Sequence, residues 1–300
     1  MLKKIEQRSA MTEKTRLGVY FGTFAPFHKG HQQQIYKCAA LNDQVLLVVS
    51  GYTHDRGDKI GLPLALRYQY LQEAFADEDD IDVAMLDETD LPPMPQGWDA
   101  WFTRLFDLLK NYQSQEITFY VGEPEYVTEL SARFPQDSHT YKVEMADRQD
   151  IKISATEIRA HPLLHWNEIN PVFRRHFTKI VGIIGGRQSG KSTLARRLAR
   201  SFNNAPFAKD IEQAITSAGN QGIIFIDNTL SPDMDLVLLI PSDNDEALLR
   251  EIAEQGLAEK VVRLDDEETV RDTRAYLGRY YHAIDAISQY TGIQIDRLKY

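Results

Sequence analysis

The chain has 300 residues, of which 43% are hydrophobic and 26% charged, with 17 Gly and 12 Pro. This ordinary globular composition excludes collagen-like and low-complexity chains, and the length suggests two domains. The formal net charge of −10 shows no excess of the basic residues on which nucleic-acid binding depends, so we expect no nucleic-acid partner.

The longest apolar runs, such as 45–49 and 236–240, are far shorter than the roughly 20 residues needed to span a bilayer. The N-terminal residues lack the apolar core of a secretory signal, and we expect 1–15 to be a flexible extension. The single cysteine, Cys38, excludes an internal disulfide and fits a reducing compartment. We therefore expect a cytoplasmic protein with no membrane partner.

Strands and helices alternate through the first half of the chain. Hydrophobic patterning predicts strands at 16–21, 45–50, 81–86, 117–121 and 140–145, and helices at 30–41, 63–76, 98–109 and 124–134. Continuous apolar strands that alternate with helices indicate βαβ units. The sequence therefore predicts a first α/β domain over 16–172, with a doubly wound parallel sheet.

The alternating pattern begins again after a helical segment predicted at 165–177. It predicts strands at 179–184, 222–226, 236–240 and 260–264, and helices at 191–202 and 267–290. We expect this smaller α/β domain to cover 173–300.

The segment from Gly22 to His31, GTFAPFHKGH, connects the first strand to the first helix. Ligands of open α/β sheets bind at the carboxyl ends of strands, and helix N-termini favour anions. His28 and His31 can both donate hydrogen bonds to one phosphate chain. The alternative is that they are solvent-exposed loop histidines, but the strand–glycine–helix context favours phosphate binding.

The segment 153–159, ISATEIR, is the second candidate. Ser154 and Thr156 suit the first turn of a helix, where hydroxyls cap the helix or bind phosphate, and Arg159 can reach a terminal phosphate. By itself this segment is equally an ordinary helix cap followed by a surface arginine. Together, the two segments resemble the HxGH and ISxTxxR motifs of the nucleotidyltransferase superfamily, which hold ATP during adenylyl transfer.

The segment GGRQSGKS at 185–192 matches G-x-x-x-x-G-K-[ST] between a predicted strand and helix, the pattern of a P-loop. We expect its backbone, with the Lys191 ammonium, to bind ATP phosphates. The expected ATP-binding residues are Gly185, Gly186, Gln188, Ser189, Gly190, Lys191, Ser192 and Thr193. Ser192 and Asp227, at the end of the next apolar strand, are the candidate Mg²⁺ ligands, although Asp227 could equally be a turn residue.

Further segments make the resemblance more specific. PQGWDAW at 95–101, the Asp147–Arg148 pair before ISATEIR and the P-loop together resemble the NadR-type family, which joins a nicotinamide mononucleotide (NMN) adenylyltransferase to a ribosylnicotinamide kinase. The resemblance implies a Rossmann-like nucleotidyltransferase domain followed by a P-loop NTPase-like domain. It implies ATP binding in the first domain by Gly22, Thr23, Phe24, His28, His31, Ser154, Thr156 and Arg159. It also implies NMN binding by Trp98, Arg67 and Arg148.

The second half departs from that family. The segment 205–210, APFAKD, stands where the family has a WEYGRE-like segment, and we expect a shortened kinase domain without an evident lid. Thr23 stands where the family often has Lys, and no helix-turn-helix precedes the first strand. The resemblance is good over 16–200 and poor beyond.

The expected reaction converts ATP and NMN into NAD and pyrophosphate, with Mg²⁺ accompanying ATP and with His28, His31 and Arg159 as the catalytic residues. The second domain is expected to bind ATP, with ribosylnicotinamide as a candidate acceptor, and the sequence is compatible with a homo-oligomer. Two alternatives stay open. The second domain could be a non-catalytic nucleotide sensor, or the first could adenylylate another phosphate-bearing acceptor.

Overall fold

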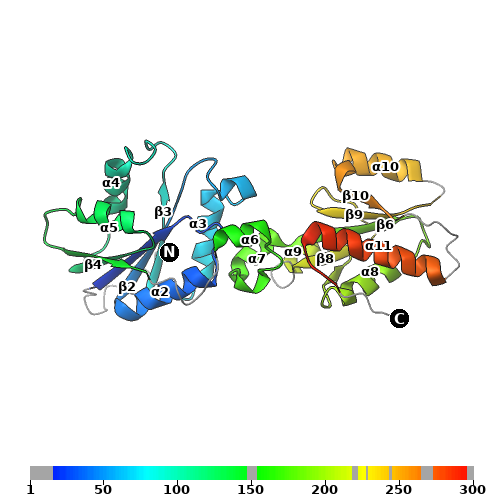
Figure 1. The fold of residues 1–300 in the computed structure, drawn as a ribbon, viewed down its shortest axis with the longest axis horizontal. Coiled ribbons are helices and arrows are strands. Elements are labelled where there is room, and N and C mark those ends of the chain that lie inside the picture. The colour runs from blue at the N-terminus through cyan, green and yellow to red at the C-terminus, as the bar shows by residue number, and fades with distance from the viewer. Residues whose placement is uncertain are drawn as a thin grey trace. The chain divides into compact units, whose positions relative to one another are not determined.

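The computed structural model describes residues 16–146, 154–217, 222–227, 229–242, 245–264 and 273–295. The expected flexible extension at 1–15 and the candidate NMN ligand Arg148 lie outside these residues. The chain divides into two compact units, 1–159 and 160–300, each built around its own sheet (Figure 1).

The first unit contains a five-stranded parallel sheet in the order β3-β2-β1-β4-β5. Its strands are β1 Arg16–Gly22, β2 Gln44–Gly51, β3 Ile81–Asp87, β4 Glu116–Val121 and β5 Thr140–Met145. Its helices are α2 Lys29–Leu41, α3 Leu64–Ala74, α4 Trp98–Leu109, α5 Pro124–Ser131 and α6 Ala155–Ala160, with a short 3₁₀ turn η1 Asp58–Ile60. The predicted doubly wound parallel sheet is confirmed.

Helices cover both faces of this sheet. Figure 1 shows α4 and α5 on one face and α2 and α3 on the other. The strand β2, next to the central strand β1, is buried from Val45 to Gly51, as a strand covered on both faces must be. Aromatic side chains of α4, including Trp101 and Phe102, close the core between α4 and the sheet.

The second unit has another five-stranded parallel sheet, in the order β10-β9-β6-β8-β7. Its strands are β6 Lys179–Gly185, β7 Phe207–Ala208, β8 Ile223–Asp227, β9 Leu236–Ile240 and β10 Val261–Arg263. Its helices are α7 Pro171–Phe177, α8 Lys191–Ser201, α9 Ile211–Ser217, α10 Asp245–Glu254 and α11 Thr273–Thr291, with 3₁₀ turns η2 Trp166–Glu168 and η3 Ala258–Lys260.

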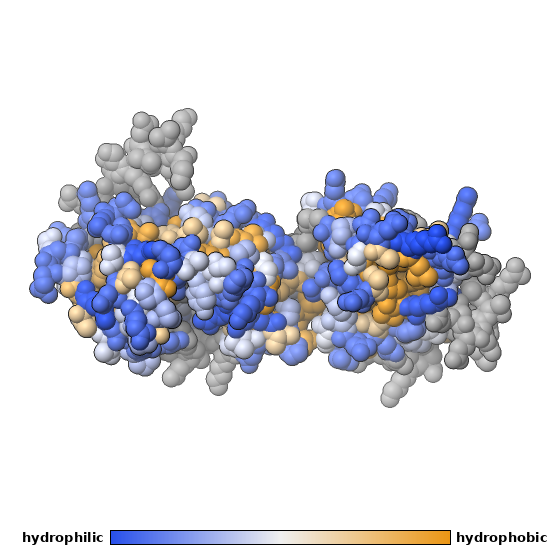
Figure 2. Space-filling view, turned by 90° about the horizontal axis from the view of Figure 1, so that it is seen from above, coloured by the Kyte–Doolittle hydropathy of each residue, from blue (hydrophilic) through white to orange (hydrophobic). Residues whose placement is uncertain are grey.

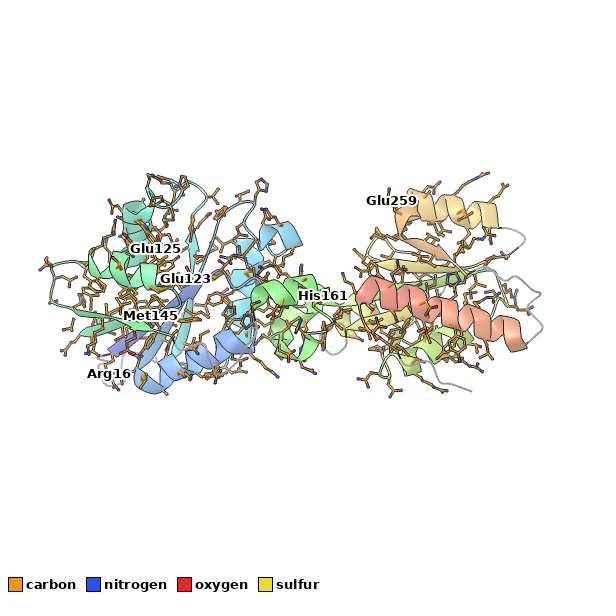
Figure 3. All side chains as sticks on the ribbon, in the orientation of Figure 1. Arg16, Glu123, Glu125, Met145, His161 and Glu259 are labelled. Carbon is orange, nitrogen blue, oxygen red and sulfur yellow. The ribbon has the colours of Figure 1, made fainter. Side chains whose placement is uncertain are left out.

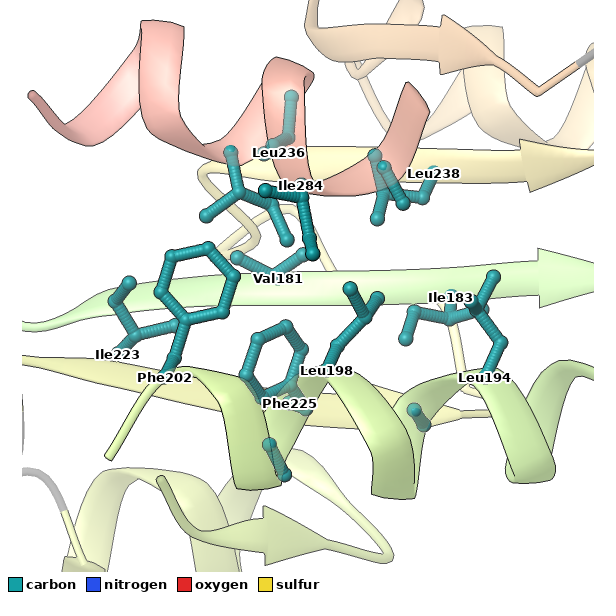
Figure 4. Packing of buried hydrophobic residues seen from close by; sticks show 14 of the residues in the cluster. Val181, Ile183, Leu194, Leu198, Phe202, Ile223, Phe225, Leu236, Leu238 and Ile284 are labelled. Atoms are coloured by element: carbon teal, nitrogen blue, oxygen red, sulfur yellow. The ribbon is translucent and has the colours of Figure 1, made fainter. Parts of the chain in front are cut away.

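The core on one face of the second sheet is closed by α8 and α11. Figure 4 shows Leu194 and Leu198 of α8 and Ile284 of α11 packed over Val181 and Ile183 of β6. The opposite face packs against α9 and α10. The strand β6 is thus buried on both sides, and the loop that follows it begins at the middle of the sheet.

The boundary between the units lies at Arg159, earlier than the predicted boundary near 172. Leu163 is buried in the core of the second unit and Trp166 packs against that core, so the segment after Arg159 belongs with the second sheet. The helix predicted over 165–177 is two pieces, η2 and α7. Pro171 explains the break, since proline supplies no backbone N–H and is favoured at the first turn of a helix.

The short elements β7, α9 and α10 were not predicted. With two residues in β7 and seven in α9, these two elements are too short to show a hydrophobic period, whereas α10, with ten residues, was simply missed. Hydrophilic residues cover most of the face seen in Figure 2, with hydrophobic residues in small groups. Among the helices of the described ranges, none has the length and hydropathy to cross a membrane.

Candidate functional site

A cavity of about 350 Å³ opens at the carboxyl ends of β1 and β4. The chain leaves β1 toward β2 and leaves β4 toward β5, on opposite sides of the sheet, so this is the point where the strand order reverses. Ligands of doubly wound folds bind at that point. The lining includes every residue predicted to bind ATP in the first domain: Gly22, Thr23, Phe24, His28, His31, Ser154, Thr156 and Arg159.

The two histidines lie one above the other at the start of α2. The His28 ring caps the helix, since its Nδ1 accepts the Gly30 N–H at 3.1 Å. A neutral His28 therefore carries its proton on Nε2. The His31 ring stacks on His28 with centroids 3.7 Å apart, and Phe24 contacts it edge-on. Neither histidine is a freely solvated loop residue, because His28 is buried and His31 is half-buried.

Segment 154–159 supplies the opposite wall of the cavity. Ser154 and Glu157 form a reciprocal cap, in which the Ser154 hydroxyl accepts the Glu157 N–H at 3.2 Å and Glu157 accepts the Ser154 N–H at 3.0 Å. Arg159 donates to the Ala25 carbonyl at 2.6 Å and to the Thr156 hydroxyl at 2.8 Å. These two bonds fix the Arg159 guanidinium at the cavity. They do not depend on whether Ser154 caps the helix or binds phosphate.

Arg56, in the loop after β2, is a cavity residue that sequence reasoning missed. Its side chain is exposed and has no hydrogen bond or ion pair among the described residues. Burial lowers the pKa of Arg159, and repulsion from the Arg56 charge lowers it further. Two guanidinium groups that line one cavity and repel each other favour an anion between them. The sequence did hold a signal for Arg56, since the segment HDRGD at 54–58 places an arginine shortly after a predicted strand, where ligands bind. No known motif includes this arginine, so it was not selected.

Arg67 was predicted to contact NMN, and the structure contradicts this. Its side chain has no exposed surface and does not line the cavity. It forms an ion pair with Asp55 at 2.6 Å and donates to the Thr23 carbonyl at 2.6 Å. A helical arginine is mostly exposed, and only the fold shows that the α3 face carrying Arg67 packs on the loops around the cavity.

Trp98, the residue predicted to stack on nicotinamide, is only 4% exposed and does not line the cavity. Its ring stacks on Phe102 at 5.6 Å and meets Tyr126 edge-on at 5.2 Å. Its Nε1 is buried with no hydrogen-bond partner among the described residues. The structure therefore places Trp98 behind Tyr126, which does line the cavity.

The remaining lining residues give the cavity its mixed character. Burial raises the pKa of the Tyr126 hydroxyl to about 12, so this ring is neutral at physiological pH. Glu123 follows the end of β4, as Figure 3 shows, and is exposed. Other lining residues that sequence reasoning missed include Gln33, Gln34 and Ser50. The cavity thus combines cationic groups with the Tyr126 ring, whose hydroxyl feels the charges of both Glu123 and Arg56.

A second candidate site is the glycine-rich loop between β6 and α8 in the second unit. Gln188 and Gly190 have φ of 65° and 85°, the left-handed region that lets backbone N–H groups converge. Gly185 lies so close to β9 that an added Cβ would be 3.0 Å from the Ile240 carbonyl. The loop begins at the carboxyl end of the central strand and closes onto the first turn of α8, where Thr193 N–H reaches the Gly190 carbonyl.

The side chains around this loop suit a phosphate and a cation. The Lys191 ammonium lies over the loop and donates to the Gly186 carbonyl at 3.0 Å. The Ser192 hydroxyl donates to the carboxylate of Asp227, which is buried at the end of β8. A hydroxyl beside a buried carboxylate presents the hard oxygen ligands that Mg²⁺ takes alongside nucleotide phosphates.

Comparisons with known proteins show which family the chain resembles. A family model described as cytidylyltransferase-like matches residues 19–161. The trifunctional NAD biosynthesis/regulator protein NadR of Salmonella typhimurium is 30% identical over 199 residues, and that of Escherichia coli is 29% identical over 203. These alignments cover 62% and 64% of this chain, and the chain spans about half the length of the curated relatives, 47% and 48%.

Two solved NadR structures align over nearly the whole chain. A complex with NR has a TM-score of 0.83 and 45% identity, and a complex with NAD and AMP-PNP has 0.79 and 44%. Each alignment covers 96% of this chain and all of the solved chain. The similarity therefore extends well past residue 200, where we expected it to fade, and the second unit is not short beside these structures. On the strength of this end-to-end similarity, the chain belongs to the NadR family.

Proposed function

We propose that the first unit is an NMN adenylyltransferase that converts ATP and NMN into NAD and pyrophosphate. The observation that carries this proposal is the convergence of His28, His31, Arg56 and Arg159 on one cavity at the reversal point of the sheet. The name of the curated relatives, which places them in NAD biosynthesis, agrees with it.

The proposed reaction is a direct displacement at phosphorus. An oxygen of the NMN phosphate attacks the α-phosphorus of ATP, a new P–O bond forms, and the bond to the β-phosphate oxygen breaks to release pyrophosphate. Negative charge grows on the leaving pyrophosphate, so such chemistry depends on positioning and charge stabilisation more than on acid–base groups. We propose that the rings of His28 and His31 and the guanidinium groups of Arg56 and Arg159, which all line the cavity, stabilise that charge.

The acceptor is proposed to lie at the Tyr126 end of the cavity. A neutral aromatic ring there suits a flat pyridinium cation, and Glu123 adds a compensating negative charge nearby. Trp98 contributes by supporting Tyr126 and not by direct stacking. A different phosphate-bearing acceptor would need its own contacts at this end, so a panel of acceptors tests the assignment.

The test is purified protein incubated with ATP and a panel of acceptors, with pyrophosphate and ADP scored separately. We expect pyrophosphate and NAD from NMN, and we expect His31→Ala to abolish both while the circular dichroism spectrum is unchanged. His282→Ala, an exposed histidine of α11 in the second unit, is the matched control. Near-normal turnover of His31→Ala would rule out its assignment.

For the second unit we propose ATP binding by residues 185–193, with Mg²⁺ held by Ser192 and Asp227. The hydrogen bond between those two side chains is the observation that favours this. Bound Mg²⁺ would neutralise phosphate charge, while Lys191 and the backbone N–H groups orient the phosphates. A solved relative of matching extent holds NR, which supports ribosylnicotinamide as the phosphoryl acceptor over a purely sensing function. Release of ADP on addition of ribosylnicotinamide decides between them.

A further inference from the structure

Beside the cavity lies an ion pair that the proposed reaction does not use. Asp55 follows β2, Arg67 lies on α3, and their side chains meet at 2.6 Å with 4% and 0% of their surface exposed. A buried ion pair is weak support for stability, because desolvation of both charges offsets most of their attraction. A buried ion pair can instead specify one conformation of the segments around it. The contacts of Asp55 and Arg67 show which segments this pair holds.

The pair reaches the cavity through Arg67. One guanidinium nitrogen donates to the Thr23 carbonyl at 2.6 Å and lies 3.3 Å from the Ser50 carbonyl. Thr23 and Ser50 both line the cavity, at the ends of the adjacent strands β1 and β2. Arg67 therefore ties the phosphate-side loop to the neighbouring strand end from beneath.

Asp55, the residue before Arg56, binds the two residues that follow Arg56. Its Oδ1 accepts the N–H of Gly57 at 2.7 Å and that of Asp58 at 2.9 Å. Those bonds determine the direction of the chain through Arg56, whose own side chain has no hydrogen bond or ion pair among the described residues. The position of the Arg56 guanidinium thus depends on a carboxylate that faces away from the cavity.

Two glycines leave room for this arrangement. An added Cβ at Gly51 would lie 2.5 Å from Asp55 Oδ2 and 2.6 Å from an Arg67 nitrogen. At Gly57 it would lie 2.7 Å from the Leu62 carbonyl and 2.9 Å from Arg67 Cζ. The loop from Gly51 to Gly57 therefore packs closely around the buried pair, and Arg56 lies in this loop and lines the cavity.

We propose that Asp55 and Arg67 are positioning residues, which hold Arg56 opposite Arg159 so that both guanidinium groups bind one polyphosphate that the pair itself never touches. A rigid loop holds the Arg56 guanidinium in place before the ligand arrives. Binding then costs less free energy than if the ligand had to order this cation beside a second, repelling one. This inference rests on the proposed adenylyl transfer and adds to it the source of the cavity's preorganisation.

A double-mutant cycle tests the proposal. Arg56→Ala, Asp55→Asn and the combination are compared for the KM of ATP and the kcat of NAD formation. If Asp55 acts through Arg56, each single variant raises the KM of ATP about tenfold, the value of one charged hydrogen bond, and the combination raises it no further. If the KM of ATP in the double variant rises by the product of the two single effects, the proposal is overturned, since Asp55 would then act independently of Arg56.

Asp55→Asn leaves Arg67 as an unpaired buried charge and the variant could unfold. The pair is therefore also removed whole, as Asp55→Asn with Arg67→Met, which leaves no net buried charge. We expect this protein to fold and to match Arg56→Ala in its KM for ATP. A folded pair-deletion variant with a wild-type KM would overturn the proposal. Asp43→Asn, which breaks the exposed pair with Arg16 at the opposite end of β1, is the matched control (Figure 3).

The ATP affinity of the same variants is also measured by calorimetry. Because both units are proposed to bind ATP, the site in the first unit is identified as the one whose affinity Arg56→Ala lowers. If wild type binds ATP but forms no NAD, the proposed reaction fails while the cycle still reports on positioning. Asp55→Asn should weaken that same site and add nothing to Arg56→Ala. An Asp55→Asn protein with undiminished ATP affinity would contradict the positioning role by itself.

Discussion

Arg56 and Arg67 lie in the same stretch of sequence and have opposite environments. Arg56 is exposed in the cavity, whereas Arg67 is buried against Asp55 and the Thr23 carbonyl. The charge of each residue is known from its type, but its function depends on what covers it. At the scale of single residues, burial is therefore what separates a group that binds a ligand from one that supports the site.

Trp98 offers a direct test of burial against function. Because its ring is packed among Phe102, Trp101 and Tyr126, we expect Trp98→Ala to lower the free energy of unfolding by about 3–5 kcal/mol. Trp98→Phe keeps much of this packing and serves as the matched control. In the folded fraction, the KM values for NMN and ATP should change by similar factors. A selective rise for NMN in steady-state assays would restore direct stacking by Trp98.

Glu88 predicts a pH dependence of stability. Burial raises the pKa of this carboxyl, partly opposed by the hydrogen bond from Trp101 Nε1 at 3.0 Å. The folded state therefore holds the proton more tightly than the unfolded chain. Its stabilising contribution is complete below the ordinary value of 4.5 and is lost as the pH rises through the raised value.

Glu88→Gln, which keeps an acceptor for Trp101, should remove that dependence. We expect its urea midpoint to gain on the wild type as the pH rises from below 4.5 toward neutrality. Glu125→Gln, at an exposed position of α5 (Figure 3), is the comparison variant and should follow the wild type. Parallel curves for wild type and Glu88→Gln would refute the prediction.

At the scale of elements, the ends of helices carry both stability and function. His28 caps the N-terminus of α2 with Nδ1 and also lines the cavity, so one side chain both starts a helix and belongs to the candidate site. Ser154 does the same for α6. In contrast, Asn170 caps α7 and belongs to neither candidate site, so only a structural effect of its cap is expected.

Asn170→Ala should destabilise α7 locally. The Asn170 side chain is buried and accepts the Val172 N–H at 3.0 Å, so its loss costs about 0.5–2 kcal/mol. We expect faster amide hydrogen exchange in the peptide covering α7, measured by mass spectrometry, with exchange in α2 unaffected. Asn170→Asp retains the acceptor and should retain most of the protection. Unaltered exchange in Asn170→Ala would show that the cap contributes nothing.

At the scale of the whole molecule, two parallel sheets each place a candidate phosphate-binding loop beyond a central strand. The loops follow β1 and β6, and each begins a helix. The first relies on histidine and arginine side chains, and the second relies on backbone N–H groups and one lysine. Each unit has its own core and its own candidate site, so the two reactions should be separable by mutation.

Lys191→Ala tests that separation. Removing the ammonium should abolish ATP binding at the second unit and any ADP release with ribosylnicotinamide, because the loop loses its charged group. NAD formation from NMN should stay within twofold of the wild type, about the scatter expected for distant sites. Arg200→Ala, at an exposed position of α8, is the matched control. Equal loss of both products would show that one site serves both reactions.

The sequence by itself determined the parallel α/β class, most strands and helices, the positions of the two candidate phosphate-binding loops and the family resemblance. These depend on local pattern: apolar runs, glycine spacing and capping residues, all of which act within a few positions of the chain. The match of predicted and observed strands from β1 to β5 is an example, since each is a continuous or alternating apolar run.

Only the tertiary structure decided which side chains reach the cavity. It brought Arg56 in, put Arg67 beneath the loops, placed Trp98 behind Tyr126 and moved the boundary of the units to Arg159. Each outcome depends on packing between segments far apart in sequence, such as α3 against the loops after β1 and β2. A local pattern carries no information about such partners, because burial is a property of the assembled layers.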